Sequence, residues 1–193
     1  MDWQQYYKER PVSLERFIDN IWDHKPFLVE ITSSAKKNKE ILEVGSGSGA
    51  LSAFLSHLGY KTISIDNDEG VLNIARQNNA YLNGKVTFQK ADAYRLPFRD
   101  NSFDVCFSQG FFEHFEDKDI KELLKEQLRV AKVVIFSVPT FWYPRQDFGD
   151  ESLMKKEDWL QILSPFNVEK AVYYGVKKGT EASASQIYFR VIK

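Results

Sequence analysis

The sequence has little of what several classes of protein depend on. It contains one cysteine, Cys106, and three scattered histidines. A disulfide framework within the chain is therefore excluded, and the apolar run around Cys106 predicts a buried, reduced thiol. The histidines and the cysteine lack the spacing of a metal-ligand set, so we expect no metal site. No apolar run approaches the ~18 residues of a membrane span, and residues 1–10 are polar. We therefore expect a soluble, cytoplasmic protein.

An excess of charge of either sign is also absent. The 26 lysines and arginines nearly balance the 27 aspartates and glutamates, so no overall positive field would attract a nucleic acid. A compact, uncharged small molecule is the easier ligand to expect. A chain of 193 residues with 43% apolar residues can bury roughly 70% of its unfolded surface around one core. We expect one domain over residues 1–193, with a helical N-terminal cap or lid in 1–39 and the core in 40–193, as a monomer or a homodimer.

Short strand-like runs alternate with helical segments along most of the chain. Apolar residues at helical spacing predict a helix after Pro11, and Pro26 begins a second helix. The predicted strands are 41–44, 62–65, 85–89, 103–107, 133–138, 168–176 and 186–192, and the later predicted helices are 50–58, 71–82, 120–130 and 154–163. This alternation predicts an α/β fold with a parallel sheet covered by helices on both faces. The last two adjacent strands predict an antiparallel hairpin at the sheet edge.

A glycine-rich loop joins the first predicted strand to a helix. Gly45, Ser46 and Gly47 permit a tight turn and close approach of a ligand to the backbone. With Ala50, the loop also fits the looser pattern of dinucleotide-binding proteins. Glu43 distinguishes a dinucleotide from S-adenosylmethionine as the ligand of this loop. A carboxylate so close to the loop would repel the pyrophosphate of a dinucleotide, whereas it favours the cationic groups of S-adenosylmethionine.

Acidic residues follow the next two strands. Asp66 ends the second strand, where a carboxylate can accept hydrogen bonds from ribose hydroxyls, and Asn67 follows it. Asp68 is interpreted as the N-cap of the next helix. After the third strand, Asp92 can accept a hydrogen bond from an adenine amino group while the backbone amide of Ala93 donates to a ring nitrogen. An ordinary loop aspartate is the alternative for Asp92.

Together, these segments resemble the class I S-adenosylmethionine-dependent methyltransferases, in particular the small-molecule group that includes ubiquinone and menaquinone biosynthesis C-methyltransferases. The matching stretches are Ile41 to Gly49, Ile63 to Asp66, Ala91 to Ala93 with Leu96 to Phe98, Ser102 to Phe107 with Glu113 and His114, and Val133 to Pro139. The resemblance implies a Rossmann-like sheet of seven strands, mostly parallel, with an antiparallel last strand. It implies that Glu43, Gly45 and Gly47 surround the methionine part of the cofactor. Asp66 would hold the ribose, Asp92 and Ala93 the adenine, and Gln109 would lie beside the methionine.

The acceptor side of such a site is less well specified by the sequence. In-line methyl transfer depends mainly on positioning, so a dedicated base is optional. His114 is the candidate base, because its titration range suits proton transfer and the family places this loop beside the transferred methyl. Alternatively, His114 orients the loop or caps the next helix, and Glu113 is interpreted as structural. His24 and His57 are expected to be ordinary surface or core residues.

Aromatic residues occur where this family builds its lid. They could enclose a flat or apolar acceptor, or they could form a dimer contact or ordinary packing. The predicted lid residues are Tyr6, Tyr7, Phe111, Trp142, Tyr143 and Arg145. The sequence thus predicts a small-molecule methyltransferase that uses S-adenosylmethionine and releases S-adenosylhomocysteine. A non-catalytic cofactor- or partner-binding domain of this fold and an NAD(P)-dependent oxidoreductase remain as alternatives.

Overall fold

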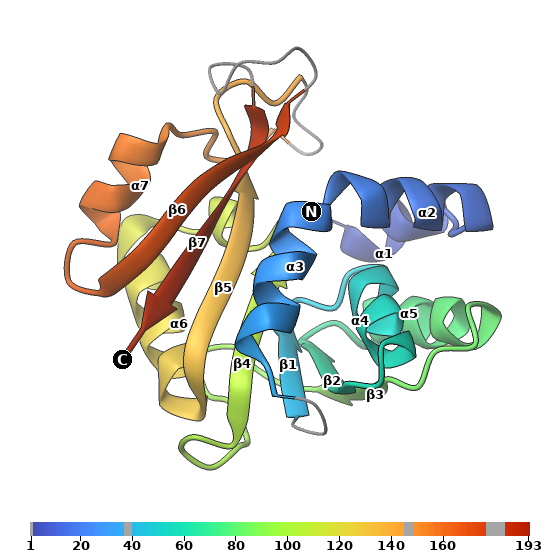
Figure 1. Cartoon of the computed structure of the whole chain (residues 1–193). Coiled ribbons are helices and arrows are strands. Elements are labelled where there is room, and N and C mark those ends of the chain that lie inside the picture. Colours follow the sequence, from blue (N-terminus) through green and yellow to red (C-terminus); the bar gives the residue numbers. More distant parts are fainter. Residues whose placement is uncertain (1, 37–39, 145–148, 177–183) are drawn as a thin grey trace.

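A single mixed β-sheet runs through the computed structural model, which describes residues 2–36, 40–144, 149–176 and 184–193 (Figure 1). The strands are β1 (Glu40–Val44), β2 (Lys61–Asp66), β3 (Thr87–Lys90), β4 (Phe103–Gln109), β5 (Ala131–Pro139), β6 (Asn167–Val176) and β7 (Ala184–Ile192). Their order in the sheet is β3-β2-β1-β4-β5-β7-β6. Only β7 runs against the others, between β5 and β6. The predicted seven-stranded sheet with an antiparallel last strand is confirmed.

Helices cover both faces of the sheet, as predicted. One face carries α3 (Lys25–Ser34), α4 (Ala50–His57) and α5 (Glu69–Tyr81), and the other carries the short 3₁₀ helix η1 (Phe112–His114), α6 (Asp117–Val130) and α7 (Lys156–Ile162). Each face has its own apolar core. The core on one side includes Phe27 of α3, Leu55 of α4 and Phe107 of β4. The core on the other side includes Leu124 of α6 and Trp159 of α7. The predicted burial of the Cys106 thiol is confirmed, since this free cysteine of β4 has no exposed surface.

The N-terminal segment differs from the sequence prediction in two respects. A short helix, α1 (Trp3–Lys8), precedes the first predicted helix, and the Asp2 side chain caps it by accepting a hydrogen bond from the Gln5 amide. The predicted helix itself is present as α2 (Leu14–Asp23). However, part of its apolar stripe faces solvent, because α2 turns another side toward a pocket described below. Leu14, Ile18 and Trp22 are 58%, 63% and 71% exposed.

In the parts of the chain that the structure describes, no helix combines the length and apolar character required to cross a membrane.

Candidate active site

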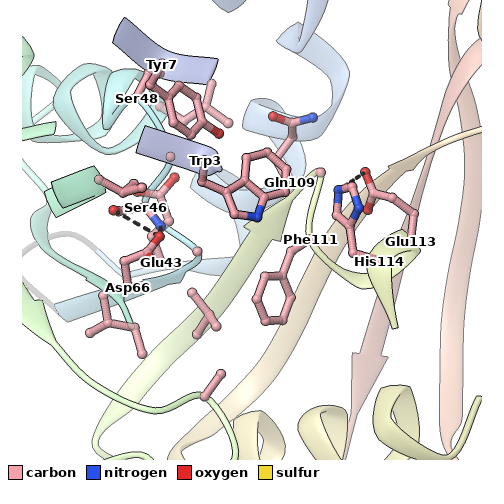
Figure 2. A pocket seen from close by; sticks show the side chains of 18 of the residues that line it. Trp3, Tyr7, Glu43, Ser46, Ser48, Asp66, Gln109, Phe111, Glu113 and His114 are labelled. Atoms are coloured by element: carbon pink, nitrogen blue, oxygen red, sulfur yellow. Dashed lines mark hydrogen bonds and ion pairs between the residues drawn. The ribbon is translucent and has the colours of Figure 1, made fainter. Parts of the chain in front are cut away.

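A cavity of about 420 Å³ opens where the parallel strands β1, β2 and β4 end. Ligands of open α/β sheets bind at this edge, and the volume lies within the usual range for small-molecule sites. Figure 2 shows the cavity lined by side chains from α1, from the glycine loop and from the segment after β4. The structure brings together on this wall every residue that the sequence predicted for a cofactor: Glu43, Gly45, Ser46, Gly47, Asp66, Asn67, Asp92, Ala93 and Gln109.

The glycine loop is shaped by backbone conformations that favour glycine. Gly45 and Gly47 have φ angles of 80° and 48°. The amides of Gly45 and Ser46 both donate hydrogen bonds of 3.0 Å to the Ile65 carbonyl, which ties the loop to β2. A Cβ atom added to Gly47 would lie 2.5 Å from the Tyr7 hydroxyl oxygen. The loop is therefore in direct contact with helix α1.

Glu43 presents a buried acid to the cavity. Only 4% of the residue is exposed, and its Oε2 accepts hydrogen bonds from Ser52 Oγ at 2.5 Å and from Ser64 Oγ at 2.6 Å. Burial raises the pKa of Glu43 to about 7, although the two serine hydrogen bonds oppose the shift. The serines fix the position of the carboxyl group. A cationic ligand group beside it would favour the ionised form.

The acidic residues at the ends of β2 and β3 also make local hydrogen bonds. Asp66 Oδ2 accepts a hydrogen bond of 3.1 Å from the Ser46 amide, and the Ser46 hydroxyl lies 3.5 Å from the same oxygen (Figure 2). Burial is the main reason that the pKa of Asp66 lies above its ordinary value. Asp68 caps α5 by accepting hydrogen bonds from the amides of residues 70 and 71, which confirms its predicted role. Asp92 Oδ1 accepts a hydrogen bond of 2.9 Å from the Tyr94 amide.

The predicted base lies at the opposite side of the cavity. His114 Nδ1 is 3.1 Å from Asp150 Oδ1, and its Nε2 is 4.0 Å from Glu113 Oε1. The indole ring of Trp3 meets the imidazole edge-on, with ring centroids 5.0 Å apart. Glu113 is 3% exposed, and burial raises its pKa to about 8. His114, Asp150 and Glu151 each place a potential ligand atom within 4.8 Å of the others, but no further feature indicates an ion there.

The predicted lid is partly assembled around the cavity. Tyr6, Tyr7, Phe111 and Tyr143 line it. Trp142, also predicted for the lid, is not among the residues that line the cavity. Its ring packs on Tyr173 of β6, with ring centroids 5.8 Å apart, which agrees with the alternative of ordinary packing. The remaining lid residue, Arg145, lies outside the described residues.

Sequence reasoning missed the contribution of α2 and β7 to the cavity. Asn20 and His24 of α2 line it, as does Gln186 of β7. His24 was expected to be an ordinary surface or core residue, and the structure places it in the cavity wall. The signal available in the sequence was the spacing of four between Asn20 and His24, which places both on one helix face. His57, by contrast, is exposed, and its Nε2 lies 2.9 Å from the Leu82 carbonyl oxygen.

Comparison with known proteins relates this chain to methyltransferases. Residues 41–133 match the family model of a methyltransferase domain. The matched segment, just under half of the chain, is similar to methyltransferase domains. The chain is also similar to the ubiquinone/menaquinone biosynthesis C-methyltransferase of Pseudomonas fluorescens, with 33% identity over 130 residues that make up 60% of this chain and 48% of that protein. A probable chloroplastic tocopherol O-methyltransferase of Oryza sativa is 32% identical over 135 residues, covering 66% of this chain and 35% of the rice protein. The chain thus spans about half or less of the length of these curated relatives.

Solved structures share the fold of this chain at low sequence identity. A Pyrococcus horikoshii protein superposes with a TM-score of 0.74 at 19% identity, covering 93% of this chain and 92% of that one. The magnesium protoporphyrin IX methyltransferase of Synechocystis, crystallised with bound S-adenosylhomocysteine, gives a TM-score of 0.67 at 14% identity and covers 88% and 80%. These similarities confirm the Rossmann-like architecture.

Proposed function

We propose that this chain uses S-adenosylmethionine to methylate a small-molecule acceptor. The observation that supports it is the convergence of the predicted cofactor residues on one cavity, with the buried acid Glu43 beside the glycine loop. The names of the curated relatives point to the same class of reaction. A nicotinamide cofactor is disfavoured, because its pyrophosphate would approach the loop next to this carboxyl group.

The residues of the cavity suit the parts of this cofactor. Gly45 and Gly47 provide a cradle without side chains, and Glu43 offers a carboxylate to the ammonium and sulfonium groups. Asp66 accepts hydrogen bonds from the ribose hydroxyls, and Asp92 accepts one from the adenine amino group. The adenine and methionine ends are completed by Ala93 and Gln109 respectively. When bound, S-adenosylmethionine supplies an electrophilic methyl group on a cationic sulfur.

His114 serves as the general base in this proposal, for an acceptor whose proton must leave. Its contact with Asp150 Oδ1 is compatible with an Nδ1 that donates a hydrogen bond, which leaves Nε2 as the proton-accepting nitrogen. Trp3 packs against the imidazole and restricts its orientation. Helices α1 and α2 act as the cap over the site, because both contribute side chains to the cavity.

Calorimetric titration with S-adenosylhomocysteine tests the proposal without knowledge of the acceptor. We expect micromolar binding, and no binding of NADH or NADPH. Asp66→Ala should weaken binding by ~1.5 to 3 kcal/mol, because a hydrogen-bond acceptor that carries charge is lost. Asp68→Ala is the matched control, since it removes a helix cap worth ~1 kcal/mol and leaves the cavity wall intact. Binding of NADH in place of S-adenosylhomocysteine, or binding of neither, would overturn the proposal.

The role of His114 requires a turnover measurement with an acceptor identified by screening. His114→Asn should lower kcat by about 100-fold or more, because general bases contribute on this scale. The affinity for S-adenosylhomocysteine should stay unchanged. His57→Asn, a substitution on the exposed end of α4, should leave kcat unchanged. An unaltered kcat in His114→Asn would show that the histidine only positions the loop.

A further inference from the structure

Three buried polar atoms in the wall of the cavity have no hydrogen-bond partner among the described residues. They are Asn20 Oδ1, His24 Nε2 and Glu113 Oε2. Buried polar atoms are almost always paired, because leaving one unpaired costs free energy comparable to a lost hydrogen bond. Since all three belong to the same cavity, one ligand could supply the missing partners.

The protonation of His24 can be derived from its surroundings. Its Nδ1 lies 2.9 Å from the backbone carbonyl oxygen of Asn20, which can only accept a hydrogen bond. Nδ1 therefore carries the hydrogen, and in the neutral ring Nε2 carries a lone pair. Burial lowers the pKa of His24, although this hydrogen bond and the nearby Asp23 act in the opposite direction. The ring also packs edge-on against Tyr174, with ring centroids 6.0 Å apart. His24 is a fixed, neutral hydrogen-bond acceptor.

The orientation of α2 agrees with a polar ligand. A surface helix normally turns its apolar stripe inward. Here α2 directs Asn20 and His24 toward the cavity, while Leu14, Ile18 and Trp22 stay largely exposed. Exposed apolar side chains and unpaired buried polar atoms both reduce stability. A polar molecule bound against this side of α2 would offset the cost of the unpaired polar atoms.

Building on the proposed function, we infer that Asn20, His24 and Glu113 bind the methyl acceptor, and that the acceptor is a neutral molecule with hydroxyl groups. The lone pairs of Asn20 Oδ1 and His24 Nε2 call for hydrogen-bond donors and disfavour a carboxylate or a phosphate. Glu113, with its pKa raised to about 8 by burial, is largely uncharged at pH 7. None of these three side chains therefore carries a full negative charge that would favour an ammonium group. The aromatic rings of Trp3 and Phe111 in the same cavity suit a flat molecule.

Nitrogen NMR of the protein labelled with ¹⁵N-histidine tests this inference directly. The probes are resorcinol and 1,3-dimethoxybenzene, which share a ring but differ in their hydroxyl hydrogens. We expect His24 to show a protonated Nδ1 and an unprotonated Nε2, and resorcinol to shift the Nε2 resonance. The dimethyl ether should leave this resonance in place. An equal response to both probes, or a response to resorcinol at His57 but not at His24, would overturn the inference.

Variants separate this inference from the proposed function. His24→Asn and Asn20→Ala should each weaken resorcinol binding by about 10-fold, the loss expected for one hydrogen bond. Both should bind S-adenosylhomocysteine as the unaltered chain does, whereas His57→Asn should change neither affinity. Unchanged resorcinol binding in both α2 variants would contradict the inference. If the unaltered chain fails to bind S-adenosylhomocysteine, the proposed function is wrong, and the spectra recorded with resorcinol alone still decide the role of His24.

Discussion

Glu113 links the chemistry of the cavity to the stability of the chain. The residue is 3% exposed, and the pKa of its carboxyl group is raised from 4.5 in an unfolded chain to about 8 in the folded protein. The folded state therefore binds more protons than the unfolded state between these values. The contribution of Glu113 to the free energy of unfolding is therefore fully present below pH 4.5 and is lost as the pH rises through 8.

Glu113→Gln should remove this dependence, because an amide does not titrate. Between pH 5 and pH 9 the unaltered chain should lose on the order of 3 kcal/mol of stability relative to the variant. Urea unfolding at pH 5, 7 and 9 measures the difference. Glu122→Gln, at an exposed position of α6, should keep the pH dependence of the unaltered chain. Parallel curves for Glu113→Gln and the unaltered chain would show that Glu113 is ionised in the folded state.

At the scale of single residues, the sequence predicted one side of the cavity better than the other. Glu43, Asp66 and Asp92 could be found because each follows a predicted strand at a fixed distance along the chain. His24 and Asn20 could not be placed in this way. Their position depends on how α2 lies over the sheet, and the apolar periodicity of α2 suggested the opposite orientation.

At the scale of elements, Tyr7 determines how closely α1 approaches the glycine loop. The Tyr7 hydroxyl lies over Gly47, where an added Cβ would be 2.5 Å away. Gly47→Ala should therefore combine this clash with the cost of a side chain at positive φ, which is roughly 1 to 2 kcal/mol. We expect a total destabilisation of about 2 to 3 kcal/mol in urea unfolding.

Gly59 provides a matched control for this substitution. Its φ angle of 89° is also positive, but no atom lies within 4 Å of an added Cβ. Gly59→Ala should show the backbone cost alone. In a Tyr7→Ala background, Gly47→Ala should cost no more than Gly59→Ala, because the clash has been removed. Equal costs for Gly47→Ala with and without Tyr7 would show that α1 does not rest on the loop in solution.

At the scale of the whole molecule, the alternation of strands and helices was sufficient to predict the sheet and its two helical layers. Buried parallel strands and amphipathic helices leave a local pattern in the sequence. The position of β7 between β5 and β6 leaves no such pattern, because it depends on pairing between segments about fifty residues apart. Helix α1 was also missed, since its six residues include none that are buried.

The antiparallel direction of β7 also has a consequence for the synthesis of the chain. Because β7 runs against β5, Gln186 near its start pairs with Pro139 at the end of β5 and lies in the cavity wall. A nascent chain on the ribosome can form β1 to β5 and the glycine loop long before residue 186 has left the exit tunnel. During that time the nascent chain lacks the part of the cavity wall that Gln186 forms, and the edge of β5 is unpaired. The side of the cavity formed by the glycine loop can therefore fold before the side that contains Gln186.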